Sequence, residues 1–312
     1  MTAVRMHDAA PSDQAASLRR LVAVRSRPTR VLVIASGKGG VGKTNLAVNL
    51  GLAFQQLGSE TLLLEADLGL GNAEVLLGAE FSADLTDWLS GACTFQDTVV
   101  EGPEGLQLVG AGSSLEQLAD LDEITVMRLL GEVAAMPAPP EIMLVDLGAG
   151  LGPSVRAALS AARELLLVVT PEPTSMTDAY AIAKFLARHN PSIHLQLVVN
   201  RVKDLDEAVS VHRRLSRVIR EFLGLRLSLA GQIPDDAAVG RAVRGQTPFL
   251  LTAPLAQASV AVRRLAADIS GRRAQGTGQS ILSYLASFVR RDRRRRAGEV
   301  TVSCLPEIDC LR

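Results

Sequence analysis

A run of glycines and lysines near residue 40 has the residue types and spacing of a phosphate-binding loop. The run is Gly37-Lys38-Gly39-Gly40-Val41-Gly42-Lys43-Thr44, and it matches the pattern G-x-x-x-x-G-K-S/T. The glycines let successive backbone N–H groups turn toward phosphate oxygens, and the positive end of a helix that begins near Thr44 strengthens the attraction. In this pattern Lys43 reaches the β- and γ-phosphates and the Thr44 hydroxyl binds Mg²⁺. The sequence therefore predicts a site for a nucleoside triphosphate and Mg²⁺ that extends from Gly37 to Asn45.

Lys38 is a second lysine inside this loop, at a position where the pattern specifies no residue type. One interpretation is a solvated charge with no role. Alternatively, a cation near the phosphates stabilises the charge that develops in phosphoryl transfer, as an arginine finger does, with an effect of about 10³–10⁵ on the rate. A loop lysine that points away from its own nucleotide needs a second subunit to present it, so this interpretation predicts a dimer.

Two aspartates follow apolar runs that are typical of buried strands. Asp67 lies just beyond the run 61–64, and Asp146 ends the run 142–145 before a turn of small residues that includes Gly148 and Gly150. A carboxylate at the carboxyl end of a strand, beside the phosphates, can accept a proton or hydrogen bond from water, which fits Asp67. The alternative for Asp67 is a helix N-cap or turn residue. Burial of Asp146 is costly without a cationic partner, so we expect it to lie in the Mg²⁺ site.

These side chains need a sheet that brings them to one edge. Continuous apolar runs rich in β-branched residues occur at 31–35, 61–64, 106–109, 142–145, 165–169, 195–199 and 227–230. Such runs are typical of strands buried on both faces, and the helical stretches between them imply right-handed crossovers. We therefore expect one α/β domain over residues 31–270, with a mostly parallel, helix-covered sheet. The proline-rich segment 136–140 is interpreted as a loop within this domain.

Composition excludes several classes of protein. The 312 residues are 47% hydrophobic but 3% aromatic, which disfavours a nucleic-acid binder built on aromatic stacking. Cys93, Cys304 and Cys310 form no CxxC pair, so an iron–sulfur or zinc site is not expected. The sequence contains no signal-peptide pattern and no run of about 18 apolar residues, so we expect a cytoplasmic protein.

The formal charge of zero conceals an uneven distribution. Residues 1–30 carry six arginines and two aspartates, residues 271–312 carry nine arginines and four acids, and the body between them is acidic. Two basic ends on an acidic domain indicate partners or a surface that the ends contact.

The C-terminal segment 271–312 begins with a Gly-rich joint and continues with an amphipathic helical pattern at about 280–296. Its apolar residues lie within an arc of about 120° on a helical wheel, and six arginines follow them directly. The apolar set is Ile281, Leu282, Leu285, Phe288 and Val289. This pattern predicts a helix that lies in an anionic membrane interface. The alternative is that the stripe packs on the sheet domain and the arginines are solvated.

The loop and the motifs that follow it resemble one family. G-K-G-G-V-G-K-T with its extra lysine resembles the deviant Walker A motif of the MinD/ParA ATPases, in which that lysine crosses the interface of a nucleotide sandwich dimer. Glu65-Ala66-Asp67-Leu68-Gly69-Leu70-Gly71-Asn72 is similar to the family's D-x-D-x-G-x-x-N segment, with Glu65 in place of the first Asp. The segment 141–150 resembles a Walker B strand and switch II, with Leu147 in place of the usual Thr or small residue. The resemblance spans about residues 31–250.

The resemblance also implies roles for single residues. Asp67 would orient the attacking water, Asp146 would hold the Mg²⁺ shell, and Gly148 and Gly150 would sense the γ-phosphate. The expected metal site consists of Thr44, Asp67 and Asp146. Asn200 and Pro234-Asp235-Asp236 resemble the family's adenine-binding turns, and an Asn side chain offers both a donor and an acceptor to the base.

The N-terminal segment 1–30 contains a short helical pattern between Pro11 and Pro28. Taken alone it is typical of a frayed terminal helix. However, its D-Q-A-x-x-L-R sequence, which includes Asp13, Gln14, Leu18 and Arg19, resembles the activator segment of the FlhG (FleN) family. These are MinD-like ATPases that regulate flagellar number and placement and stimulate the FlhF GTPase.

The resemblance therefore implies a MinD-like (SIMIBI-class) P-loop ATPase of the FlhG type. We expect weak, dimerisation-dependent ATP hydrolysis, reversible association with the inner face of the cell membrane, and flagellar basal-body or transcription-regulator partners, with no nucleic-acid partner. The alternatives are a division-site MinD, which lacks the activator segment, and a ParA-like DNA-binding ATPase whose arginine-rich tail contacts phosphates. An iron–sulfur carrier of the same superfamily would need a cysteine pair that is missing here.

Overall fold

The computed structural model of the chain describes residues 29–67, 73–79, 81–112 and 123–272. The predicted partner segment with Asp13, Gln14, Leu18 and Arg19 therefore lies outside the described residues. So does the predicted membrane helix, with Ile281, Leu282, Leu285, Phe288 and Val289. No helix of the described part is long and apolar enough to span a bilayer.

Strands and helices alternate along the domain. The strands are β1 (Arg30–Ser36), β2 (Thr61–Ala66), β3 (Val99–Glu101), β4 (Gln107–Val109), β5 (Ile142–Ala149), β6 (Glu164–Val169), β7 (His194–Val202) and β8 (Leu227–Pro234). The α-helices are α2 (Lys43–Gln56), α3 (Ala73–Leu77), α4 (Leu85–Ser90), α6 (Glu123–Ala135), α7 (Pro153–Ala161), α8 (Pro173–His189), α9 (Leu205–Leu223), α10 (Ala237–Arg244), α11 (Phe249–Thr252) and α12 (Gln257–Arg272). Two 3₁₀ turns, Phe95–Thr98 and Pro103–Gly105, flank β3.

The strands form one eight-stranded sheet in the order β3-β4-β2-β5-β1-β6-β7-β8. All its strand pairs are parallel except β3 with β4. This confirms the predicted fold class, and each of the seven apolar runs coincides with a strand. β3 was not predicted, because a three-residue antiparallel edge strand leaves no periodic signal.

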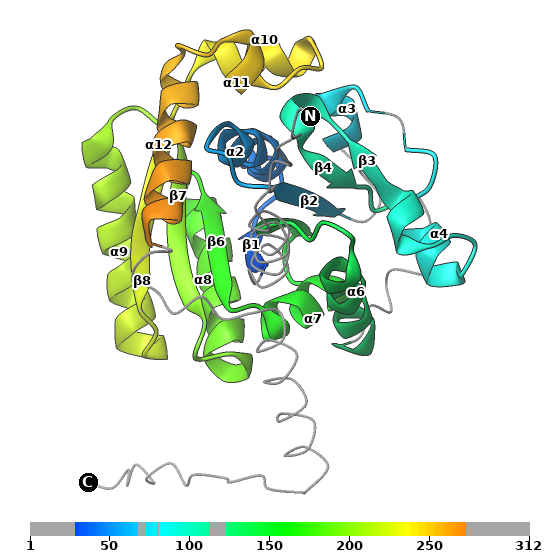
Figure 1. Cartoon of the computed structure of the whole chain (residues 1–312). Coiled ribbons are helices and arrows are strands. Elements are labelled where there is room, and N and C mark those ends of the chain that lie inside the picture. Colours follow the sequence, from blue (N-terminus) through cyan, green and yellow to red (C-terminus); the bar gives the residue numbers. More distant parts are fainter. Residues whose placement is uncertain (1–28, 68–72, 80, 113–122, 273–312) are drawn as a thin grey trace, which may run out of the picture.

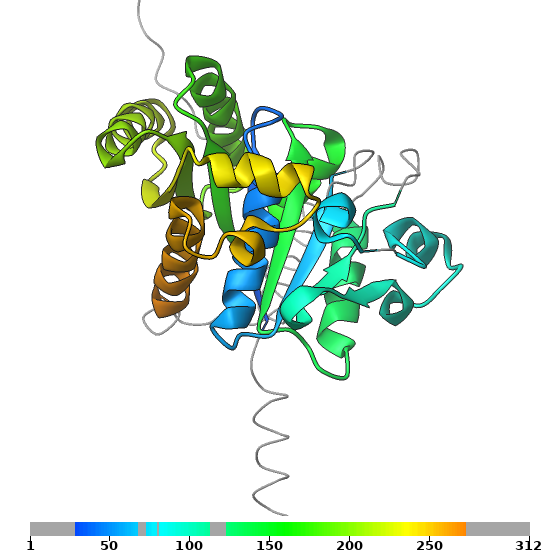
Figure 2. The same ribbon diagram turned by 90° about the horizontal axis from the view of Figure 1, so that it is seen from above.

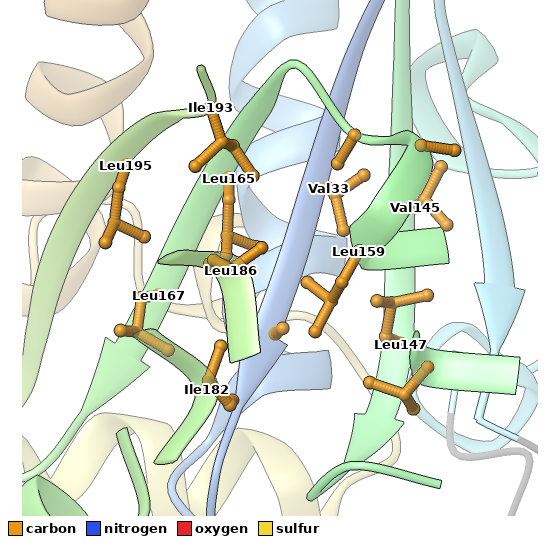
Figure 3. Close-up of a cluster of buried hydrophobic side chains, with 14 of the residues drawn as sticks. Val33, Val145, Leu147, Leu159, Leu165, Leu167, Ile182, Leu186, Ile193 and Leu195 are labelled. Atoms are coloured by element: carbon orange, nitrogen blue, oxygen red, sulfur yellow. The ribbon is translucent and has the colours of Figure 1, made fainter. Parts of the chain in front are cut away.

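Two apolar layers cover the sheet. Residues of α2, α11 and α12 pack on one face, and residues of α4, α6, α7, α8 and α9 pack on the other. Figure 1 shows α2 and α12 above the sheet and α7 and α8 below it, and Figure 2 shows the upper layer from above. In the lower layer Leu159 of α7 and Leu186 of α8 lie against the strand residues Val33 and Leu165 (Figure 3). Helices on both faces leave the carboxyl edge of the strands as the place for a ligand.

The register of the central strands brings the predicted site residues together. Asp146 of β5 is paired with Ile34 of β1 on one side and with Glu65 of β2 on the other. The loop after β1, the segment after β2 and the end of β5 therefore emerge side by side at one edge of the sheet. The proline-rich segment 136–140 contains no helix or strand and joins α6 to β5, as predicted.

Candidate functional site

The loop from Gly37 to Gly42 joins the end of β1 to the first residue of α2. A Cβ atom at Gly37 would lie 2.3 Å from the backbone carbonyl carbon of Asp178, so α8 packs directly against the loop. Gly42 has φ 89°, and a Cβ there would lie 2.4 Å from Nδ2 of Asn200. Both positions favour glycine. At Gly37 the reason is the close approach of α8, and at Gly42 it is the left-handed backbone together with the close approach of Asn200.

Lys43 is the centre of a buried charge cluster. Its side chain is 6% exposed, and its Nζ lies 2.8 Å from Oδ1 of Asp146 and 3.5 Å from Oδ2 of Asp67. Burial raises the pKa of the Asp146 carboxyl, and the Lys43 ammonium and the Thr44 hydroxyl lower it. The structure thus supplies the cationic partner that a buried aspartate needs, and it joins Lys43, Asp67 and Asp146 in one site.

The same cluster fits a magnesium ion. Oδ2 of Asp146 is buried and has no hydrogen-bond partner among the described residues. Mg²⁺ prefers oxygen ligands and is usually held by one or two carboxylates together with substrate phosphates. No group of three or more metal-ligating side chains occurs in the described part of the chain. The donor set, Asp146 with the nearby Thr44 hydroxyl, therefore suits an ion carried on a phosphate ligand.

The segment after Asp146 is tied to both the loop and Asp67. The N–H of Gly150 donates to the carbonyl oxygen of Ser36 at 2.9 Å. Gly148 is buried, and a Cβ at this position would lie 3.1 Å from Oδ1 of Asp67. A shift of this segment would therefore change its contacts with Asp67 and with Ser36, at the start of the loop.

The two departures from the family pattern are explained by where the side chains point. Leu147 is buried in the apolar layer below the sheet (Figure 3) and not in the site. Glu65 is buried, and its Oε1 accepts a hydrogen bond from the N–H of Ala73 at 3.1 Å, at the start of α3. Gly69 and Asn72 of the same motif lie outside the described residues.

Lys38 points away from Lys43. Its Nζ lies 2.5 Å from Oε2 of Glu172 and 3.1 Å from the Thr174 hydroxyl, at the start of α8. The ammonium of Lys38 lowers the pKa of Glu172. In this single chain Lys38 thus has a partner on its own subunit, and it is still 39% exposed.

The predicted adenine turns line a cavity of about 520 Å³ at the ends of β7 and β8. Asn200, Pro234, Asp235 and Asp236 all contribute to it. The Nδ2 group of Asn200 donates to the carbonyl oxygen of Val41 at 2.7 Å, so this side chain also holds the phosphate loop. The carboxylate of Asp236 accepts from the N–H groups of Ala238 and Ala258, and the first of these bonds lowers its pKa. Its side chain therefore caps helices at the wall of the cavity.

A second cavity of about 300 Å³ lies over the phosphate loop. The predicted residues that line it are Gly39, Gly40, Gly42, Lys43, Thr44, Asn45 and Asp67. Gly42, Asn45, Arg201 and Val243 line both cavities. The two cavities are therefore contiguous, and together they offer one elongated site that runs from the adenine turns to Lys43.

Several residues that line the site or contact Lys38 are not among the predicted site residues. Arg201 and Val243 join the two cavities, and Glu172 and Thr174 hold Lys38. An acidic residue with Pro and Thr directly after the run 165–169 is a signal that would have pointed to Glu172. Val243 gives no such signal, because an apolar residue on a helix is ordinarily assigned to the core.

Known proteins resemble this chain over most of its length. The CobQ/CobB/MinD/ParA nucleotide binding domain matches residues 32–249. The antiactivator FleN of Pseudomonas aeruginosa is 37% identical over 242 residues, which covers 78% of this chain and 86% of FleN. The flagellum site-determining protein YlxH of Helicobacter pylori is 28% identical and covers 84% of this chain and 89% of its own length.

A solved structure shows the same fold. The septum site-determining protein MinD of Pyrococcus horikoshii, in complex with Mg-ADP, superimposes with a TM-score of 0.65. The match covers 80% of this chain and 99% of that protein, at 23% identity.

Proposed function

This chain belongs to the CobQ/CobB/MinD/ParA family as a MinD-like ATPase of the FlhG/FleN type, and on that premise we propose that it controls flagellar number and placement through an ATP-dependent dimer. The observation that carries the proposal is the pair of contiguous cavities, with the buried cluster of Lys43, Asp67 and Asp146 at one end. ATP bound here places its base near Asn200 and its phosphates over the loop. The relatives FleN and YlxH support the flagellar role.

In hydrolysis each group of the cluster has a separate task. Backbone amides of the loop and the Lys43 ammonium hold the β- and γ-phosphates. Asp146 and Thr44 would hold Mg²⁺, which would neutralise charge that develops on the phosphate oxygens. Asp67 accepts a hydrogen bond from a water molecule, whose oxygen attacks the γ-phosphorus as the bond to the ADP oxygen breaks, and the proton of the water passes to the phosphate that is released. Gly148 and Gly150 transmit the loss of the γ-phosphate, because they contact Asp67 and the start of the loop.

Lys38 makes this chemistry depend on a second copy. In the single chain its ammonium is paired with Glu172. In a face-to-face dimer Lys38 leaves this partner and binds the phosphates of the opposite subunit, so that dimer formation and fast hydrolysis occur together. Because exposed ion pairs contribute about 0–1 kcal/mol, the pair with Glu172 is easily given up.

The dimer is tested by light scattering with ATP and Mg²⁺. An Asp67→Ala protein, which binds ATP without hydrolysing it, is expected to form a stable dimer. Adding Lys38→Ala to it should return the protein to a monomer, whereas adding Glu172→Gln should leave or strengthen the dimer because it frees Lys38. A Lys38→Ala protein that dimerises and hydrolyses ATP at the full rate would contradict the proposal.

We further propose that the ends of the chain connect the ATPase cycle to its partners. Residues 280–296 attach the dimer to the anionic inner face of the cell membrane, and residues 1–30 stimulate an FlhF-type GTPase through Gln14 and Arg19. Basal-body or transcription-regulator proteins bind the dimer. Support comes from the apolar stripe with its arginines, the activator-like sequence and the flagellar relatives.

Two measurements test these ends. The protein should sediment with anionic vesicles even at high salt, because the apolar stripe is buried in the lipid. If the protein instead sediments with DNA, and this binding weakens steeply as salt is added, a ParA-like role is favoured. A peptide of residues 1–30 should stimulate the GTPase activity of a purified FlhF-type protein. A peptide with Gln14→Ala and Arg19→Ala is the matched control, and a lack of stimulation by the native peptide would leave only the general MinD-like assignment.

A further inference from the structure

Arg201, directly after Asn200 in β7, has a backbone conformation that arginine rarely adopts. Its φ is 57°, and within the described residues it shares a positive φ with only two other non-glycine residues, Glu104 and Gln246. The pairing of β7 with β8 shifts its register between Asn200 and Val202, so Arg201 is the bulged residue. Such left-handed positions are strained for a residue with a side chain, and they gather at functional sites.

The bulge places Arg201 at the junction of the two cavities. Of the four residues that line both cavities, Arg201 carries the only charge. The base of a bound nucleotide lies near Asn200 and its terminal phosphates near Lys43. The ribose and the α-phosphate must therefore pass the junction beside Arg201.

Among the described residues, none forms an ion pair with Arg201. Its side chain is exposed and forms no ion pair or hydrogen bond with the part of the chain that the structure describes. The facing carboxylate is Glu172, whose pKa is lowered first by Lys38 and only last by Arg201. Since Lys38 holds Glu172 at 2.5 Å, the guanidinium is free to bind an anion, and its planar fork of donors matches phosphate oxygens.

We propose that Arg201 binds the α-phosphate of the nucleotide in its own subunit. The inference rests on the proposed function and adds a residue that sets nucleotide affinity. ATP and ADP both carry an α-phosphate, so the contact stabilises both complexes to the same extent. Arg201 therefore acts on binding, whereas Lys38 acts on the dimer and on hydrolysis.

The test compares full-length proteins that differ at or next to this position. Arg201→Asn removes the charge and keeps a residue that tolerates the left-handed backbone. Arg201→Lys keeps the charge without the fork. Lys203→Asn is the matched control, since Lys203 is an exposed cation two residues away that lines neither cavity. The dissociation constants of ATP and ADP are measured with Mg²⁺ by calorimetry, together with kcat at saturating ATP.

Arg201→Asn is expected to raise both dissociation constants by a similar factor of about ten or more. Arg201→Lys should show a smaller rise, and Lys203→Asn none. Unchanged affinity in both Arg201 variants would overturn the inference. So would unchanged ADP affinity with a lost ATP-dependent dimer, because that result places Arg201 across the interface.

The failure of this inference differs from the failure of the proposed function. An unmodified protein that binds neither ATP nor ADP refutes the ATPase itself. An unmodified protein that binds both, beside an Arg201→Asn variant of equal affinity and unchanged melting temperature, refutes only the role of Arg201.

Discussion

Single side chains in this site are placed by contacts as much as by their own chemistry. Lys43 is buried and paired with Asp146, so its ammonium is held at the end of the site where we propose that the phosphates bind. Lys38 lies in the same loop, yet it is half-exposed and paired with Glu172. Two lysines five residues apart thus differ in their partners because one is buried and the other is exposed.

The loop glycines offer a prediction with an internal control. Gly37→Ala is expected to lower the free energy of unfolding by about 2 kcal/mol, because the new Cβ meets the backbone of α8, which cannot move aside as a side chain would. Gly39→Ala should change it by about 0.5 kcal/mol or less, since no described residue apart from its chain neighbours has an atom within 4 Å of the new Cβ. Urea denaturation without nucleotide measures both. Equal destabilisation of the two variants would show that the contact with α8 is not the cause.

At the scale of elements, β5 is both a central strand of the sheet and the support of a site residue. Its residues pair with β1 and β2 nearly to its end, and there Asp146 lies in the site while Leu147 lies in the core (Figure 3). The alternation of side chains along a strand makes this possible, because neighbours point to opposite faces. Leu147 therefore anchors the strand directly before Gly148, where the segment begins that we propose senses the γ-phosphate.

Shortening this anchor should loosen the end of β5. Leu147→Ala is expected to lower the free energy of unfolding by about 2–4 kcal/mol, because it removes a buried side chain and leaves a cavity. Leu147→Met, of similar volume, should cost about 1 kcal/mol. Chemical denaturation at pH 7 compares the two. If both variants are as stable as the unmodified protein, Leu147 does not anchor the strand.

For the whole molecule, the edge of the sheet opposite the site is held by an ion-pair clamp. Arg30 of β1 donates to both carboxylate oxygens of Glu164 in β6 and to the carbonyl oxygen of Ile269 in α12. His194 of β7 lies 3.9 Å from the same carboxylate. The clamp joins three strands to the helix that precedes the C-terminal segment.

The clamp gives the fold an acid-sensitive contribution. Burial alone would raise the pKa of Glu164, but His194 and Arg30 lower it from 4.5 to about 2. A lowered pKa stabilises the fold above the unfolded value of 4.5, and this stabilisation is lost as the pH falls toward 2. Glu164→Gln is expected to lower the free energy of unfolding by about 2 kcal/mol at pH 7, and the difference should shrink below pH 4.5.

Urea denaturation between pH 7 and pH 3 measures this difference. Glu172→Gln is the control, because Glu172 is an exposed acid whose ion pair adds little to stability. A Glu164→Gln variant whose destabilisation is the same at every pH would contradict the assignment of the effect to this carboxylate.

The sequence by itself determined the parallel sheet, the loop from Gly37 to Thr44 and the two aspartates at strand ends. These features are local. An apolar run predicts a buried strand, and the spacing of the glycines and lysines predicts a phosphate-binding loop. Because parallel strands end at one edge, the meeting of Asp67 and Asp146 with the loop followed from the sheet alone.

The tertiary structure alone decided which side chains complete the site. Lys38 is paired with Glu172, which lies 134 residues away in the sequence, and Asn200 binds a carbonyl group 159 residues away. The bulge at Arg201 and the orientation of Leu147 likewise depend on neighbouring strands and helices. No local pattern contains these contacts, because each is set by the packing of segments that are distant along the chain.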